Sequence, residues 1–326
     1  MNAESGQSAT TAQARAAQRA EITLASIKER RSNRRRALQM LWNNRLGSIG
    51  ALILILVTIA AVFAPFLAPA DPNHGEIVSR LQCPVLTSCP RFGTDQTIHG
   101  SSKHILGTDQ LGRDILSRII YGARISLIVG LTAVAIGAGF GTIMGLVSGY
   151  YGRWADSLIM RVGDVFLAFP FFLLAIAIVA AIGGGLFNVI VVLAVASWVP
   201  YARLIRGSVL SSKAQEYVIA ARAIGVRDMG LLLKHILPNV ITPVIVYATF
   251  GVAAAIIAEA GLSFLGLGVG GTVSDWGAML ADGRQYVGTA WWLATIPGVA
   301  IMLTVLSINM IGDWIRDALD PHLRNI

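Results

Sequence analysis

Long apolar runs alternate with polar segments along most of this chain of 326 residues. A helix needs about 20 mostly apolar residues to cross the hydrocarbon core of a bilayer. Six stretches meet this requirement approximately: 49–68, 125–147, 165–182, 186–199, 240–260 and 293–311. Three consecutive glycines at 183–185 separate the third and fourth, so a tight antiparallel hairpin is expected there, with the fourth helix continuing through Ile205. The pattern predicts an all-α membrane protein with six transmembrane helices.

The distribution of basic residues predicts the orientation of these helices. Nine Lys and Arg residues precede position 48, and six more lie between Arg203 and Lys234. Cytoplasmic segments of membrane proteins carry such an excess, so both regions and both termini are expected in the cytoplasm. The predicted divisions are a basic cytoplasmic tail (1–47), a first membrane helix (48–68), an extracytoplasmic loop (69–124), a five-helix core (125–316) with a cytoplasmic loop (207–238), and a cytoplasmic C-terminus (317–326).

Composition agrees with this picture and excludes other classes of protein. Hydrophobic residues make up 55% of the chain and charged residues only 13%, which excludes a water-soluble globular domain with an ordinary polar surface. The net charge of +8 reflects membrane orientation, because the basic residues are not interleaved with aromatic residues as in a nucleic-acid-binding surface. We expect a lipid membrane and no nucleic acid as a partner.

The cytoplasmic segment 215–239 predicts a helix, a turn and a second helix. Tyr217, Ala220, Ala221 and Ile224 have the spacing of one helical face, with Arg222 turned away from it. Two alanines on that face allow close approach of a partner. Gly225 suits the left-handed conformation that ends a helix, and Asp228 is expected to cap the second one, while Pro238 begins the next membrane helix. The alternative is a helix anchored at the membrane interface.

This segment resembles the "EAA" loop of permease subunits of ABC importers, through Ala220, Ala221, Gly225, Leu237 and Pro238 at the family's spacing. The family's glutamate and isoleucine are replaced here by Ile219 and His235. The resemblance implies a type I (MetI-like) permease fold in which the helix around Ala221 is a coupling helix. By that resemblance Tyr217, Ala220, Ala221, Ile224 and Gly225 dock on an ATPase subunit.

Two further segments resemble the oligopeptide and dipeptide branch of this permease family. They are residues 104–127, which include the run from Gly107 to Asp114, and residues 258–268 followed by 275–280. The resemblance implies a pore-forming subunit of a peptide importer in a bacterial or archaeal plasma membrane. Its partners would be a second homologous permease, two ATPase subunits that bind ATP and Mg, and an extracytoplasmic solute-binding protein. Glutathione, nickel chelates and oligosaccharides are alternative substrates in the same branch.

Several single residues invite a more specific interpretation. Glu259 is an ionisable residue close to a membrane boundary, and it either lines the translocation pathway or is satisfied by backbone amides. Asp164 is expected to pair with Arg161. Glycines recur every four residues in the second span, at Gly137, Gly141, Gly145 and Gly149. Such a row predicts a helix-packing seam, with a neighbour in this chain or in a second permease.

The remaining candidates concern cysteine, metal and catalysis. Cys83 and Cys89 lie in the predicted extracytoplasmic loop, where an oxidising compartment permits a disulfide. The histidines of that loop lack metal-ligand spacing and are expected to be solvated, so no metal is predicted. No lysine follows a glycine or precedes a Ser or Thr, so the chain has no P-loop and is expected to be no enzyme and to hold no cofactor. A secondary transporter or a membrane-embedded enzyme would need intramembrane charges that the spans nearly lack.

Overall fold

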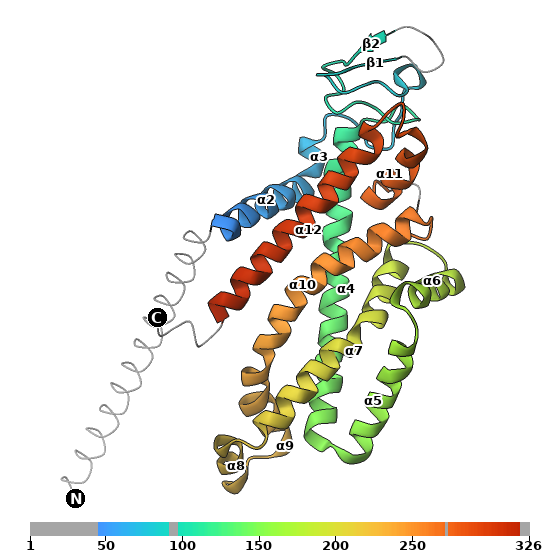
Figure 1. Ribbon diagram of the computed structural model, residues 1–326. Coiled ribbons are helices and arrows are strands. Elements are labelled where there is room, and N and C mark those ends of the chain that lie inside the picture. The colour runs from blue at the N-terminus through green and yellow to red at the C-terminus, as the bar shows by residue number, and fades with distance from the viewer. Residues whose placement is uncertain (1–44, 91–96, 271–272, 320–326) are drawn as a thin grey trace, which may run out of the picture.

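The computed structural model describes residues 45–90, 97–270 and 273–319. The chain is mostly helical and elongated (Figure 1). Its helices are α2 (Arg45–Val62), α3 (Ala64–Leu67), α4 (Ile115–Tyr151), α5 (Arg153–Ala168), α6 (Phe171–Ile182), α7 (Leu186–Ser212), α8 (Glu216–Ala223), α9 (Asp228–Gly230), α10 (Leu237–Phe264), α11 (Trp276–Gly283) and α12 (Trp292–Leu319). Two 3-10 turns, η1 (Ile77–Ser79) and η3 (Arg284–Tyr286), one π-helix, η2 (Leu231–Ile236), and two short strands, β1 (Ser88–Pro90) and β2 (Thr97–His99), complete the described elements.

Five of the described helices are long and apolar enough to cross a membrane: α2, α4, α7, the continuous run from α9 to α10, and α12. A sixth span is formed if the bent pair of α5 and α6 is counted as one. The expected six-span, all-α architecture is therefore approximately confirmed. Helix α4 runs the length of the bundle, and α7, α10 and α2 pack against it, while α12 packs against α2 and α10 (Figure 1).

The third span is not the single helix that its hydropathy predicted. Its two halves, α5 and α6, meet at an angle of 91°. Proline disfavours helical backbone in the residue before it, and Phe169, which precedes Pro170, is extended with φ −97° and ψ 135°. The predicted hairpin after α6 is present, with Gly183 and Gly185 at φ +87° and +124°. As expected, α7 continues past the fourth apolar run, and it ends at Ser212.

The second and first spans also differ from their predicted limits. Helix α4 begins at Ile115, ten residues before the predicted 125, because Asp114 caps it by accepting a hydrogen bond from the Ser117 amide at 2.8 Å. The first span breaks after Val62, and α3 follows from Ala64, with Pro65 in its first turn. Prolines within the first turn are tolerated there because they need no amide donor.

The glycine row of α4 lies directly against α7. Gly137, Gly141, Gly145 and Gly149 are all buried. A Cβ added at Gly141 would meet the Trp198 carbonyl oxygen and, at 2.7 Å, the Tyr201 Cβ, while one added at Gly149 would lie 2.8 Å from the Val209 Cβ. The neighbour of this row is therefore a helix of the same chain, packed close to backbone contact.

The loop between α3 and α4 folds into a compact cap at one end of the bundle (Figure 1). Strands β1 and β2 pair antiparallel in it, and Cys83 is joined to Cys89 by a disulfide. The side chain of Trp292, at the start of α12, donates to the Thr108 carbonyl at 3.2 Å and so ties this cap to the bundle.

A buried ion cluster stabilises the junction between the cap and α4. Asp109 accepts hydrogen bonds from Arg113 Nε at 2.7 Å and from Arg118 Nη1. Arg118 is therefore buried inside the protein, although it carries a charge. His104 is buried as well, with Nδ1 3.0 Å from Asp114 Oδ1, so the expectation of a solvated histidine was wrong for this residue.

Candidate functional sites: helix α8 and a mid-bundle cavity

Helix α8 projects from the end of the bundle that lies opposite the disulfide-bonded cap (Figure 1). It ends as the sequence predicted, since Gly225 adopts φ +85° and the Val226 amide donates back to the Ala221 carbonyl at 3.2 Å. This backbone pattern is the Schellman motif, which needs a residue tolerant of positive φ. The short helix therefore has a sequence-encoded stop before α9 begins.

The four residues predicted to form one exposed face of α8 do not all face outward. Ala221 is 6% exposed and packs with Val218 in a cluster beneath the helix. The Tyr217 hydroxyl is 2.6 Å from Ser212 Oγ and accepts a hydrogen bond from the Asn239 side chain at 3.2 Å. Ala220 and Ile224 are exposed, and Ile224 is 82% exposed. Ala221 and Tyr217 thus attach α8 to the bundle, and only part of the predicted face is free for a partner.

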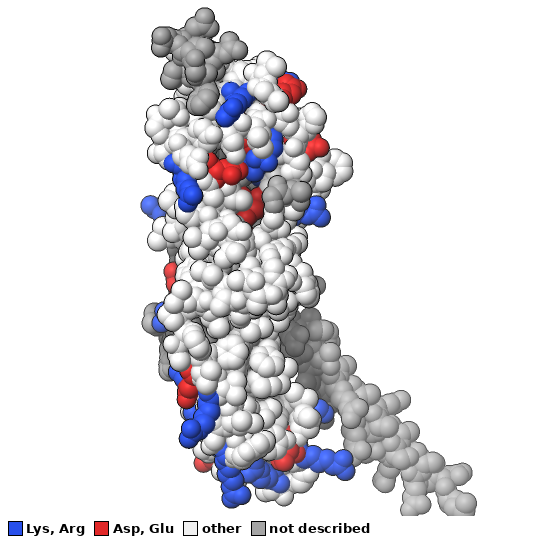
Figure 2. Space-filling view, turned by 90° about the vertical axis from the view of Figure 1, so that its right-hand side faces the viewer, with Lys and Arg blue, Asp and Glu red and all other residues white. Residues whose placement is uncertain are grey.

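An apolar surface nevertheless lies open around α8. It consists of large exposed side chains on α8, on the turn after it and on the start of the next helix: Ile219, Ile224, Met229 and Leu233. We call these four residues the α8 apolar surface. Basic side chains gather at the same end of the molecule, next to a largely uncharged middle (Figure 2), and they include the exposed Arg222, Arg227 and Lys234. Exposed apolar groups bordered by charge are typical of a protein interaction site.

Two contacts connect this end of the chain to α4. The Tyr150 hydroxyl, near the C-terminal end of α4, donates to Asp228 Oδ1, and Arg222 Nη2 donates to the same hydroxyl at 3.2 Å. The sequence predicted that Asp228 caps the second helix. Instead Asp228 is the first residue of α9, and its side chain makes no capping hydrogen bond. Arg222, expected to point away, lies with its guanidinium carbon 5.7 Å from the centre of the Tyr150 ring.

No break separates α9 from the fifth span. The helix passes from α9 through the π-helix η2 into α10, with Pro238 in the first turn of α10 as expected. Single π-turns within helices are rare and frequently occur at functional sites. A displacement of the α8 end of the molecule would therefore be transmitted along one continuous helix into the membrane.

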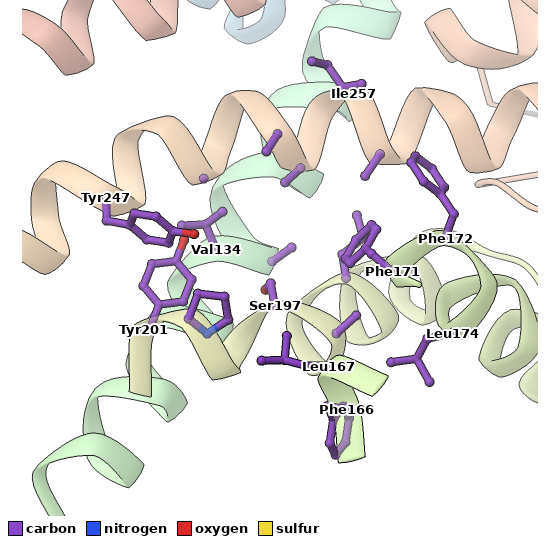
Figure 3. Close-up of a pocket in the computed structure, with 18 of the residues that line it drawn as sticks. Val134, Phe166, Leu167, Phe171, Phe172, Leu174, Ser197, Tyr201, Tyr247 and Ile257 are labelled. Atoms are coloured by element: carbon purple, nitrogen blue, oxygen red, sulfur yellow. The ribbon is translucent and has the colours of Figure 1, made fainter. Parts of the chain in front are cut away.

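A cavity of about 490 Å³ lies at mid-bundle, between α4, α5, α6, α7 and α10 (Figure 3). Aliphatic and aromatic residues make up most of its wall, and the hydroxyl groups of Ser197, Tyr201 and Tyr247 are the polar side-chain groups among the described residues that line it. The rings of Tyr201 and Tyr247 meet edge to face at 5.1 Å between centroids. The lining residues that Figure 3 labels are Val134, Phe166, Leu167, Phe171, Phe172, Leu174, Ser197, Tyr201, Tyr247 and Ile257.

Sequence reasoning did not find this cavity. Its wall includes the break between α5 and α6, which exposes Phe169, Phe171 and Phe172 to the space beside α10. Pro170 inside an apolar run was the available signal, because a proline there predicts a bend and a bend in a membrane helix leaves room beside it.

An ion pair lies one helical turn from this cavity, toward the α8 end. Arg203 Nη2 of α7 is 2.6 Å from Asp164 Oδ1 of α5. The partner of Asp164 is therefore Arg203 and not the expected Arg161, which belongs to its own helix. A second pair, Arg206 with Asp156, joins the same two helices nearer the α8 end of the molecule.

Glu259 lies in α10 but does not line this cavity. It is fully buried, and its carboxylate accepts hydrogen bonds from Ser263 Oγ at 3.0 Å and from Ser126 Oγ at 3.4 Å. The partners are side-chain hydroxyls, where backbone amides were the alternative expected from the sequence. The pathway role of Glu259 stays a prediction.

Within 45–90, 97–270 and 273–319, no group of three or more His, Cys, Asp or Glu side chains could hold a metal ion.

Comparison with known protein families decides the class of protein. The family model described as "Binding-protein-dependent transport system inner membrane component" matches residues 141–325. The chain belongs to this permease family. A second model, the "N-terminal TM domain of oligopeptide transport permease C", matches residues 32–84 of the permease.

Curated relatives extend over nearly the whole permease. The dipeptide transport system permease protein DppC of Alkalihalophilus pseudofirmus is 43% identical over 89% of this chain and 90% of its own. The di/tripeptide transport system permease protein DppC of Pseudomonas aeruginosa is 42% identical over 86% and 89%. The glutathione transport system permease protein GsiD of Escherichia coli is 45% identical over 84% and 86%. The names of these three relatives all describe permease proteins.

Solved structures confirm the fold of the permease. Inward-facing conformations of the MetNI methionine ABC transporter match it at 20% identity: the CY5 native crystal form has a TM-score of 0.51 and covers 63% of this chain and 98% of that chain. The CY5 SeMet soak form has a TM-score of 0.50 and covers 62% and 97%. The type I permease fold expected from the resemblance is therefore present.

Proposed function

We propose that this chain is one pore-forming subunit of an ABC importer that takes up dipeptides and oligopeptides across a bacterial or archaeal plasma membrane. The observation that carries the proposal is the α8 apolar surface, because it leaves large side chains such as Ile224 exposed beyond the ends of the spans. An ATPase subunit docked there would cover them. The peptide substrate is supported by the names of the curated relatives in Alkalihalophilus pseudofirmus and Pseudomonas aeruginosa.

The assembly follows from the family. A binding protein outside the cell delivers the solute, a second homologous permease completes the pore, and two ATPase subunits supply the energy. ATP and Mg bind on those subunits, and this chain itself holds no cofactor. Both termini and α8 are cytoplasmic in this arrangement, which agrees with the basic residues Arg222, Arg227 and Lys234 at the α8 end.

The mechanism uses the continuous helix that begins at α9. Closure of the ATPases on ATP displaces α8, and the Tyr150–Asp228 contact moves with it. The displacement passes through η2 into α10, which carries Tyr247 on the wall of the cavity. The cavity then changes its access between the two sides of the membrane. ATP can shift the permease between these two access states only because it interacts more favourably with one of them.

Reconstitution of the complete transporter tests this proposal. The chain is purified with its partner permease and ATPases, placed in liposomes with the binding protein, and supplied with radiolabelled alanyl-alanine. ATP-dependent uptake is expected, with no uptake when ATP is replaced by a non-hydrolysable analogue. Uptake of glutathione with exclusion of dipeptides would favour the alternative substrate suggested by the Escherichia coli relative. Uptake driven by an ion gradient without an ATPase would refute the importer.

A further inference from the structure

The mid-bundle cavity poses an electrostatic problem for a peptide. Ordinary peptides carry an ammonium group at one end and a carboxylate at the other, and moving either into an apolar space without a partner is costly. The described residues that line the cavity include no Asp, Glu, Lys, Arg or His. Its hydroxyls can bond a peptide backbone, but they cannot neutralise the two ends.

Opposite charges lie just beyond the cavity, on the cytoplasmic side. Ala196 and Pro200 line the cavity, and Arg203 follows them at helical spacing on the same face of α7. Leu167 lines it from α5, and Asp164 precedes Leu167 by one turn. The ion pair of Asp164 and Arg203 therefore continues the cavity wall toward the cytoplasm.

Both members of this pair are accessible. The side chain of Asp164 is 62% exposed and that of Arg203 is 49% exposed. The neighbouring pair between the same two helices, Asp156 with Arg206, is less open, at 23% and 35%, and Asp156 also accepts a hydrogen bond from Ser148. If Asp164 and Arg203 served only to tether α5 to α7, nothing would require their side chains to be more exposed than those of Asp156 and Arg206.

We propose that Asp164 and Arg203 bind the two charged ends of a peptide as it leaves the cavity. The Arg203 guanidinium takes the peptide carboxylate, and the Asp164 carboxylate takes the peptide ammonium. One ion pair is exchanged for two, and an ion pair between such exposed side chains is worth at most about 1 kcal/mol, so the contact does not trap the peptide. The proposal rests on the function proposed above and names two positioning residues for it.

Substrate preference distinguishes this role from a tether. Removing one charge leaves the other uncompensated beside the path: Arg203→Gln leaves a negative site, and Asp164→Asn leaves a positive one. The probes are alanyl-lysine and alanyl-glutamate, and the complete transporter is assayed in proteoliposomes at saturating peptide. The binding protein is the same in every assay. Its own preference between the two peptides therefore cancels when the uptake ratio of a variant is divided by the uptake ratio of the parent.

The expected result is a pair of opposite shifts. We divide the maximal uptake rate of alanyl-lysine by that of alanyl-glutamate. This ratio should rise about threefold in Arg203→Gln and fall about threefold in Asp164→Asn, because a half-exposed charge contributes less than about 1 kcal/mol. Matched controls are Asp156→Asn and Arg206→Gln, which loosen the same two helices and should leave the ratio unchanged. The double variant Asp164→Asn with Arg203→Gln, whose amides can still bond each other, should assemble normally but slow the uptake of both peptides.

Three results would overturn the proposal. They are ratios that stay at the parental value in both single variants, ratios that shift in the same direction, and a double variant that transports at the parental rate. A parent transporter that takes up neither peptide would instead refute the peptide substrate itself, and the binding of peptide ends would be refuted with it.

Discussion

The Tyr150 hydroxyl donates a hydrogen bond to the Asp228 carboxylate and so joins the end of α4 to the start of the helix that becomes α10. Arg222, from the last turn of α8, donates to the same hydroxyl. One tyrosine therefore contacts both the helix proposed to meet the ATPase and the helix proposed to move in the membrane. The three residues form a joint between the proposed site of ATP-driven motion and the helix that carries part of the cavity wall.

The first prediction concerns this joint. Tyr150→Phe removes the hydroxyl but keeps the ring, so the Arg222 guanidinium can still lie over it while Asp228 loses its donor. We expect the transporter to assemble and hydrolyse ATP, with the amount of peptide transported per ATP lowered about tenfold, because a hydrogen bond to a charged group contributes roughly 1.5 kcal/mol. Parallel assays of ATP hydrolysis and uptake measure this ratio.

Tyr151→Phe is the matched control for that experiment. The neighbouring tyrosine is half exposed, and its ring lies edge to face against Tyr150. Removal of the Tyr151 hydroxyl should leave the amount of peptide transported per ATP at the parental value. An unchanged ratio in Tyr150→Phe would show that the joint plays no part in coupling.

The second prediction concerns docking of the ATPase. Ile224 is the most exposed large side chain of the α8 apolar surface, and a hydrophobic side chain buried by a partner contributes about 1.5–3 kcal/mol. Ile224→Ser should weaken binding of the ATPase roughly tenfold or more while the permease remains folded. Co-purification at a series of salt concentrations measures the loss. Ile77→Ser, at an equally exposed isoleucine in the cap at the other end, is the control and should retain the ATPase; equal retention in both variants would place docking elsewhere.

Ala221→Trp has a different expected outcome from Ile224→Ser. Ala221 is buried against the bundle, so a tryptophan there would push α8 away from its own chain and not only from a partner. Loss of activity in that variant would therefore say little about docking. The exposed Ile224 and Ala220 are the informative positions of the predicted face.

The sequence predicted elements well where a local signal determined them. Hydropathy located the apolar spans approximately, and Gly225 marked the end of α8. The sequence-based prediction failed where packing between distant parts of the chain determines which side chains are buried and which are paired. Ala221 and Ile224 have the spacing of one helical face. Ala221 nevertheless packs into the cluster that contains Val218 and Val209, whereas Ile224 is exposed. Asp164 pairs with Arg203 because α5 lies beside α7, which a pattern within α5 cannot reveal.

The third prediction concerns Cys83 and Cys89. Their disulfide closes a short loop in the cap, and such a bond stabilises a protein by about 2 kcal/mol, mainly through the unfolded state. Mass spectrometry without reductant should find one linked peptide and no alkylated thiol. Cys83→Ser with Cys89→Ser should lower the melting temperature of the cap with the membrane helices still assembled. Two freely alkylated cysteines in the purified protein would contradict the bond.

The fourth prediction concerns the seam between α4 and α7. Packing is the main cohesive force between helices in lipid, so a side chain that separates two helices removes most of their association. At Gly141 a new Cβ would meet the Trp198 carbonyl oxygen, which belongs to backbone and cannot rotate away. Gly141→Leu should therefore insert into the membrane and then fail to form a stable transporter, as judged by gel filtration in detergent. Even Gly141→Ala should be destabilised, because the alanine methyl group is the Cβ that meets this oxygen.

Gly139 supplies the matched control, because it lies on the same helix and a Cβ there meets no atom within 4 Å. Gly139→Leu adds the same bulk at nearly the same depth, so it should assemble and transport like the parent if its face meets only lipid. A Gly141→Leu protein that assembles as well as Gly139→Leu would show that α4 and α7 can separate without cost. In that case the close contact of these two helices would not be what holds the core of the permease together, and the cohesion would have to come from α10 and α12.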